Sequence, residues 1–356
     1  MTEQNGHDYS SDEVALRIEA CSEKVLSWWD GQLDLSHCQC TEADIVRLAE
    51  NRLMREKLTN LDLSHNELSD ATALAEGLKL LTELTNLDLS HNELSNAEAL
   101  AEGIKPLTKL TVLCLSYNRL SDATALAEGL KPLTKLGSLY LGSNKLADAT
   151  ALAEGLKSLT KLTELELCDN RLSDVAALAV GLKPLTELIM LGLHANGLSD
   201  AAALAEGLKP LMELAELNLS FNKFSDATIL AEAISFLLPR NGGALVRLDI
   251  SGCTSLRLPD GRPVPKSILN LRDTTEIVDA IQRSLANDSQ PACEIQPSSM
   301  NVEKSIEFFI DPGEASEEEI RDVLRSLSNL QKAFGGLGLE FAIGGVSVLA
   351  REEVPV

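Results

Sequence analysis

Leucines alternate with polar residues in a short segment that recurs along most of the chain. Leu61–Leu68 reads Leu-Asp-Leu-Ser-His-Asn-Glu-Leu, and the same eight residues stand at Leu87–Leu94. Related segments begin at 26-residue intervals at Leu113, Leu139, Leu165, Leu191 and Leu217. Less regular copies begin at Leu33 and Leu248. Since strand side chains point alternately to opposite faces, each segment predicts a short strand with buried leucines and an outward Asp62 or its equivalent.

Between the predicted strands, each unit carries an Ala- and Leu-rich segment with helical spacing. In the first regular unit it follows Asp70, and Leu74, Leu78 and Leu81 recur at i, i+4 and i+7. Asp favours the start of a helix, and this spacing places the leucines on one helical face. Four units continue with a proline that we expect to stop the helix, namely Pro106, Pro132, Pro184 and Pro210. Each unit therefore predicts one strand and one helix, with the strands stacked in parallel.

One asparagine follows each predicted strand at a constant place in the unit. Backbone groups inside a narrow solenoid need partners, and an amide both donates and accepts hydrogen bonds. A stacked row of amides is therefore expected to join consecutive turns. The row comprises Asn66, Asn92, Asn118, Asn144, Asn170, Asn196 and Asn222.

These positions resemble the leucine-rich repeat, whose pattern is L-x-x-L-x-L-x-x-N/C-x-L. In the first regular unit the matching residues are Leu58, Leu61, Leu63, Asn66 and Leu68. The resemblance covers roughly residues 32–258. It implies an α/β horseshoe-shaped solenoid with a parallel concave sheet and outer helices. Because the family accepts Asn or Cys in the row, it also implies structural roles for Cys38 and Cys253.

The two ends depart from the regular period. Residues 1–57 are predicted to form an N-terminal helical cap with the first irregular repeat, including a less regular helix over Thr41–Arg55. Residues 58–259 form the predicted array, and residues 260–301 a C-terminal cap helix and linker. The flanking segments loosely resemble the repeat region of bacterial Roco proteins. The chain has no Gly-Lys-Ser or Gly-Lys-Thr, so the phosphate loop of their GTPase domain is absent from the sequence.

The last segment, residues 302–356, predicts a small unit with the order β-α-β-β. Two apolar runs at 337–343 and 346–350 flank Gly344-Gly345, which is a hairpin signal.

Composition narrows the classes of partner. Asp and Glu number 54 against 31 Lys and Arg, which gives a net charge of −23 at pH 7. Nucleic acids and anionic membranes attract basic surfaces, so neither is expected to bind this chain. The first twelve residues lack a secretory pattern, and the seven cysteines are an odd number. The expected setting is therefore the cytoplasm, with reduced thiols.

No catalytic, cofactor or metal site is predicted. Neither Gly-x-Ser-x-Gly nor His-Glu-x-x-His occurs in the sequence. The spacing of His37, His65 and His91 allows metal binding, but duplication of the whole segment already accounts for His65 and His91. Cys38-x-Cys40 lacks the second pair that zinc sites contain. We therefore expect a protein that is not an enzyme.

Functional side chains are expected where residues vary while the frame of the repeat is constant. These are the outward strand positions and the position just before the Asn row, all predicted to line the concave face. Exposed aromatic residues among carboxylates are typical of a protein-binding surface. The candidate partner-binding residues are Asp62, His65, Asp88, His91, Tyr117, Tyr140, Glu164, Glu166, Asp169, Met190, His194 and Phe221.

This surface favours a non-catalytic interaction scaffold whose acidic concave face binds a basic protein or peptide with an apolar anchor. The alternative is a regulator of a GTPase or another enzyme in trans, for which the outward strand positions offer only Arg247. A solvated acidic surface without a partner also fits the pattern. The sequence leaves the oligomeric state open.

Overall fold

The computed structural model describes residues 31–258, 261–265, 268, 277–281, 340–343 and 346–349. The chain divides into two units, Met1–Pro291 and Ala292–Val356. Within the described residues, the first unit holds one parallel sheet whose nine strands follow chain order. The strands are β1 (Gln32–Asp34), β2 (Asn60–Asp62), β3 (Asn86–Asp88), β4 (Val112–Cys114), β5 (Ser138–Tyr140), β6 (Glu164–Glu166), β7 (Met190–Gly192), β8 (Glu216–Asn218) and β9 (Arg247–Asp249).

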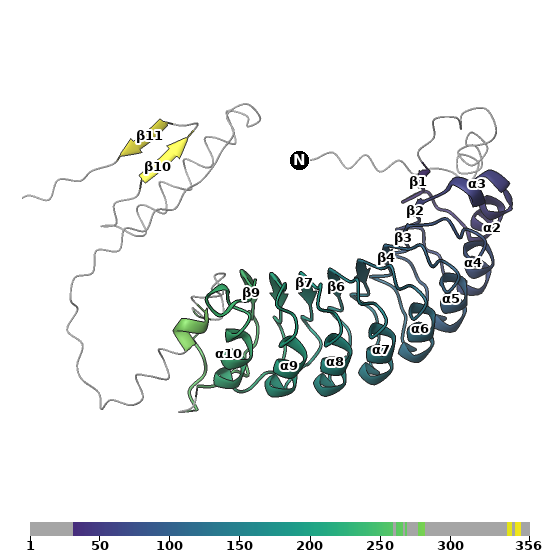
Figure 1. Ribbon diagram of the computed structural model, residues 1–356. Coiled ribbons are helices and arrows are strands. Elements are labelled where there is room, and N and C mark those ends of the chain that lie inside the picture. The colour runs from purple at the N-terminus through teal and green to yellow at the C-terminus, as the bar shows by residue number, and fades with distance from the viewer. Residues whose placement is uncertain are drawn as a thin grey trace, which may run out of the picture. The chain divides into compact units, whose positions relative to one another are not determined.

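Helices alternate with these strands along the chain and lie on the opposite side of the solenoid from the sheet. Figure 1 shows the strands along the inner side of the curved array and the helices along its outer side. The predicted solenoid with a concave parallel sheet and outer helices is thus confirmed. The helices are α2 (Glu42–Glu50), α3 (Arg52–Lys57), α4 (Ala71–Leu78), α5 (Ala97–Ile104), α6 (Ala123–Leu130), α7 (Ala149–Leu156), α8 (Val175–Leu182), α9 (Ala201–Leu208) and α10 (Ala227–Ser235), followed by the 3-10 turn η1 (Pro239–Asn241).

A single core of aliphatic side chains runs through the array between the sheet and the helices. Leu61 of β2 and Leu74 and Leu78 of α4 are buried there, together with Leu63 and Leu81 in the segments that follow these elements. The equivalent leucines of the other units are buried in the same way. Each unit covers the core of its neighbour, so no unit can bury its apolar face without the next.

The Asn row joins each turn to the preceding one, as the sequence predicts. The Asn144 side chain donates to the carbonyl of Leu115 in the preceding unit at 2.9 Å and to that of Leu141 in its own turn at 3.1 Å. Its oxygen accepts the N–H of Leu120 at 3.0 Å. The other asparagines of the row are also buried and also donate to the preceding unit.

Cysteines replace this amide at the two ends of the array. The thiol of Cys38 donates to the carbonyl of Ser36 at 3.2 Å, and that of Cys253 donates to the carbonyl of Leu219 at 3.3 Å. Both side chains are fully buried. A thiol thus supplies a donor at the place of the Asn amide, which is a structural role.

Two features of the helices differ from the sequence prediction. The single irregular helix expected over Thr41–Arg55 is two helices, because Asn51 ends α2 and its side chain caps α3 by accepting the N–H of Leu53 at 2.9 Å. Proline does not set the helix ends either. Helices α4 and α7 end at the same place as α5, α6, α8 and α9, although Leu80 and Ser158 stand where these four helices are followed by proline.

Glycine near the end of helices α4 to α9 permits close helix packing. A Cβ built on Gly155 of α7 would lie 2.8 Å from the Cα of Ala127 in α6, and the same approach recurs at Gly103, Gly129, Gly181 and Gly207. Cβ atoms do not come this close to other atoms, so a larger residue requires the two helices to move apart. The close approach between neighbouring helices from α4 to α9 therefore depends on a Gly–Ala contact in each pair.

The second unit contains a two-stranded antiparallel sheet among its described residues. Strands β10 (Glu340–Ile343) and β11 (Val346–Leu349) pair in a register that sets Ile343 opposite Val346. The hairpin predicted around Gly344-Gly345 is confirmed. The other elements predicted for 302–356 lie outside the described residues, as does the N-terminal cap before residue 31. Residues 277–281 are helical, within the segment predicted as a C-terminal cap helix.

Replacing Asn144 with alanine should lower the free energy of unfolding by about 2–4 kcal/mol, because buried backbone groups of two units lose their partners. The measurement is equilibrium denaturation of the Asn144→Ala variant. The exposed neighbour Lys145 provides the control, since Lys145→Ala should change stability by less than about 0.5 kcal/mol. Equal stability of the two variants would contradict the role assigned to the row.

Gly155→Ala should destabilise the protein by about 1–3 kcal/mol, because the added methyl group is forced against Ala127. Helix propensity alone predicts the opposite sign, a gain of about 1 kcal/mol. Thr150→Ala is the matched control: Thr150 is an exposed residue of α7, and its replacement should not destabilise the helix. Thermal denaturation of the two variants measures the difference, and a stabilising Gly155→Ala would refute the packing argument.

Candidate partner-binding face

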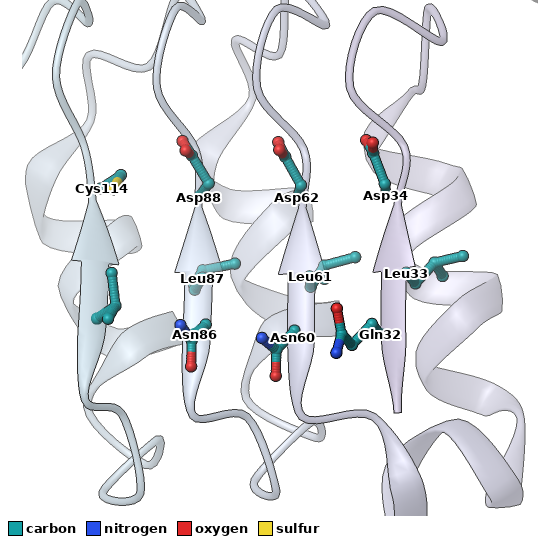
Figure 2. A pocket seen from close by; sticks show the side chains of 11 residues that line it. Gln32, Leu33, Asp34, Asn60, Leu61, Asp62, Asn86, Leu87, Asp88 and Cys114 are labelled. Atoms are coloured by element: carbon teal, nitrogen blue, oxygen red, sulfur yellow. The ribbon is translucent and has the colours of Figure 1, made fainter. Parts of the chain in front are cut away.

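The concave face is hollowed over its first four strands. The hollow has a volume of about 310 Å³ and is lined from β1 to β4. Figure 2 shows two rows of polar side chains there: carboxylates where the strands end and amides where the strands begin. The carboxylates belong to Asp34, Asp62 and Asp88, and the amides belong to Gln32, Asn60 and Asn86. The strands pair in register, so each row crosses them at right angles.

The carboxylates of this row also hold the turn that follows each strand. One oxygen of Asp62 accepts the N–H of Ser64 at 2.8 Å, and Asp88 accepts that of Ser90 at 2.8 Å. In β8 the amide oxygen of Asn218 takes the same role with an N–H at 3.0 Å. An asparagine therefore suffices for the turn, and the negative charge of the aspartates is not needed for it.

Next to the carboxylates, four aromatic rings stack in a continuous ladder. The ring centroids of His37 and His65 are 4.2 Å apart, those of His65 and His91 4.0 Å, and those of His91 and Tyr117 4.1 Å. Interplanar angles of 11–14° make all three contacts parallel stacks. Tyr117 ends the ladder with 55% of its surface exposed. The ladder thus presents a tyrosine ring to solvent beside an acidic hollow.

A left-handed backbone conformation places these rings. The residue just before each Asn of the row has φ between +49° and +57°, whether it is His65, Tyr117, Ala195 or Phe221. Its N–H reaches the next unit; that of His65, for example, donates to the carbonyl of Ser90 at 3.1 Å. Histidine tolerates this region better than most residues. Every unit therefore projects one variable side chain at the same place.

The remaining candidate residues form separate groups rather than one site. The hydroxyl of Tyr140 donates to Glu164, and burial, followed by this contact, raises the pKa of Tyr140 to about 12. Asp169 is exposed and accepts a hydrogen bond from Ser143 at 3.2 Å. Met190 is half-buried at the start of β7. Phe221 is 65% exposed and lies against Gly252, where a Cβ would come within 2.5 Å of the ring.

His194 lies apart from the histidine ladder, in a group that the sequence analysis missed. Glu166, Cys168 and His194 each offer one potential ligand atom, and these atoms lie within 4.8 Å of one another. Burial raises the pKa of the Cys168 thiol to about 12, and the adjacent Glu166 carboxylate adds to the shift. The signal in the sequence is the departure from serine, which occupies this place at Ser64 and Ser220.

The predicted partner-binding set left out Asp34 and His37, although the sequence already shows His37 in the row of histidines; the two residues extend the acidic row and the ladder by one unit. Both lie in the irregular first copy, Leu33-Asp-Leu-Ser-His-Cys, whose order matches the regular segments at every position but the last. That match was the available signal.

Charge is distributed unevenly between the two faces of the array. On the outer helices, glutamates pair with lysines three residues on, such as Glu102 with Lys105 at 3.3 Å. On the concave side, Arg247 is the one cation among the first and last strand positions and the ladder position of the described units, and it pairs with Glu216 at 2.8 Å. The strand and ladder positions of the concave side therefore hold several carboxylates and a single arginine among the described units.

No helix among the described residues has the length and apolar character needed to cross a membrane.

A family model for the leucine-rich repeat matches residues 56–75, a segment that contains β2 and Asn66. The same strand, turn and buried amide recur through the array. The chain is a leucine-rich-repeat protein. A comparison with curated proteins gives no match. The resemblance of the flanking segments of this leucine-rich-repeat protein to Roco proteins stays a prediction.

Several solved leucine-rich-repeat structures are similar to this protein. Internalin C2 of Listeria monocytogenes is 29% identical with a TM-score of 0.46, over 62% of this chain and 80% of that one. A leucine-rich-repeat protein of Leptospira interrogans is 21% identical with a TM-score of 0.40, over 56% and 59%. The ectodomain of the Arabidopsis receptor kinase HAESA, in complex with a peptide hormone, is 22% identical with a TM-score of 0.44, over 68% and 45%. The chain thus spans less than two thirds of the length of the Leptospira protein and of the HAESA ectodomain.

The pKa of His65 is lowered from its ordinary value of 6.5 by burial and by the neighbouring His91 and His37, against the opposing pull of Asp62 and Asp88. The unfolded chain therefore takes up this proton more readily than the folded one. The free energy of unfolding should fall as the pH drops below about 6.5.

The comparison is between the wild type and His65→Ser, which carries the residue found at the equivalent Ser143. Between pH 7.5 and pH 5.5 the wild type should lose more thermal stability than the variant. An equal loss would show that the stack does not resist protonation.

Proposed function

We propose that the concave face binds a protein or peptide segment that carries Lys or Arg and an apolar anchor, and that it does so without catalysis. The observation that carries this proposal is the hollow at β1–β4, in which Asp34, Asp62 and Asp88 form one acidic row beside a ring ladder that ends on exposed Tyr117. Leucine-rich repeats and other solenoids use their extended concave surfaces for binding.

The geometry of the acidic row suits a segment that runs across the strands. Neighbouring strands lie about 4.8 Å apart, so the three carboxylates span about 10 Å. In an extended segment, residues on one face repeat every 6–7 Å, which is more than the distance of about 4.8 Å between neighbouring strands. The side chains of Lys and Arg are long and flexible enough to bridge this difference. Two cationic side chains of such a segment can therefore reach the row together.

The ladder supplies the apolar part of the surface. Tyr117 is exposed, and the position it occupies accepts residues as different as His, Ser, Asp and Phe. The frame therefore does not require an aromatic ring there. An exposed ring face beside carboxylates provides a contact for an apolar side chain or for a guanidinium group.

The test is a selection of displayed random peptides that bind the full chain, followed by affinity measurement of the selected peptides. We expect enrichment of Lys or Arg with an apolar residue nearby. The Asp34→Asn/Asp62→Asn/Asp88→Asn variant keeps the hydrogen bonds of the turns, as Asn218 shows. This triple variant should weaken binding at least tenfold, because each of the three lost charges contributes about 0.5–1 kcal/mol to the binding free energy.

The control makes the same change of charge on the outer helices, with Glu76→Gln/Glu102→Gln/Glu128→Gln. This variant should bind the selected peptides as the wild type does. Tyr117→Ser tests the anchor and should weaken binding by about 1–2 kcal/mol. Peptides that show no excess of basic residues, or that bind the variant lacking the acidic row unchanged, would overturn the proposal.

A further inference from the structure

A carboxylate, a thiol and an imidazole meet on the concave face between β6 and β7, away from the hollow at β1–β4. Glu166 is the last residue of β6, Cys168 follows it by two residues, and His194 follows β7 by two. One potential ligand atom from each residue lies within 4.8 Å of the others. Residues from two adjacent units thus converge on one point, and all three are partly buried.

Two glycines leave the space that these side chains occupy. A Cβ built on Gly192 would lie 2.0 Å from Oε1 of Glu166, and one built on Gly142 would lie 2.4 Å from Sγ of Cys168. In other units the place of Gly192 holds Asp, Cys, Tyr, Glu or Asn. The Glu166 carboxylate and the Cys168 thiol therefore occupy space that a larger side chain at position 192 or 142 would fill.

One atom of the group lacks a partner. Nδ1 of His194 is buried and makes no hydrogen bond in the described structure. A buried polar nitrogen without a partner costs about 1–3 kcal/mol. A metal ion bound directly at this nitrogen would offset this cost.

The frame of the repeat does not require Cys168 or His194. Serine stands at the same place in most other units, at Ser64, Ser90, Ser116, Ser220 and Ser251. A thiol and an imidazole thus replace serine in two adjacent units, at the point where Glu166 leans over Gly192.

We propose that Glu166, Cys168 and His194 bind a transition-metal cation of the zinc type. Thiolate, imidazole and carboxylate are the ligands that Zn²⁺ and Co²⁺ use in proteins, whereas Mg²⁺ and Ca²⁺ prefer oxygen alone. Binding forms a metal–sulfur bond, and the thiol proton passes to the solvent.

The geometry needs only small adjustments for this site. Bonds of 2.0–2.3 Å in a tetrahedron hold ligand atoms about 3.5 Å apart. The atoms of the group, at up to 4.8 Å, must therefore approach by about 1.3 Å at most. Three protein ligands leave a fourth position for water or for an atom of a partner.

The experiment is a titration of the full, reduced chain with Co²⁺, followed by absorption spectroscopy. We expect the near-ultraviolet charge-transfer band of a thiolate–Co²⁺ bond together with visible bands typical of tetrahedral Co²⁺. Addition of one equivalent of Zn²⁺ should remove both, and addition of Mg²⁺ should not.

The variants Cys168→Ser and His194→Ser introduce the serine that most other units have at this place, so both should fold. Thermal denaturation without metal checks this directly. Cys168→Ser should lose the charge-transfer band, and His194→Ser should lower the affinity for Co²⁺ at least tenfold. Gly192→Asn, which fills the space of the Glu166 carboxylate, should also weaken binding.

Cys114→Ser is the matched control, since it removes another partly buried thiol beside a carboxylate of the same face. It should bind Co²⁺ as the wild type does. A wild type without the charge-transfer band, or a folded Cys168→Ser variant that keeps it, would overturn the proposal. Peptide binding enters neither readout, so this test stands apart from that of the concave-face scaffold.

Discussion

The buried amide of one asparagine per unit is the interaction on which the rest of the array depends. The turns after the strands lie inside a narrow solenoid, where their backbone groups have no access to water, and an unpaired group there costs as much as a lost hydrogen bond. Asn144 satisfies groups in its own turn and in the preceding one. This link sets adjacent turns in register, and the left-handed residue before each Asn is a consequence of the same tight turn.

From that register follow the rows on the concave face. Asp62 and Asp88 lie side by side because their strands pair residue for residue, and the same pairing brings His65 and His91 into stacking distance. On the outer side, contacts such as that between Gly155 and Ala127 keep the helices close. The constant spacing of the strands thus comes from hydrogen bonds, whereas the constant spacing of the helices comes from steric fit.

The fold could be predicted almost wholly from the sequence, because it repeats one local pattern. Alternating leucines gave the strands, and the buried amides were evident from their constant place. The break of the first helix at Asn51 was missed, because one side chain decides it against an otherwise helical pattern. The groups on the concave face were predicted only in part. The positions of the Glu166 and Phe221 side chains depend on the small size of a residue in the next unit. For Glu166 this residue is Gly192, 26 residues further on, and for Phe221 it is Gly252, 31 residues further on.

The duplicated units at the start of the array give the acidic row an unusual statistical property. Asp34, Asp62 and Asp88 occupy equivalent places, each with a histidine of the ladder in the same unit. A ligand with a single positive charge therefore finds three nearly identical positions. This degeneracy favours association by RT ln 3, about 0.65 kcal/mol, without any additional contact. For the cationic segment proposed above, it would also make neighbouring positions along the row nearly equal in energy, so that a bound segment could move from one strand to the next.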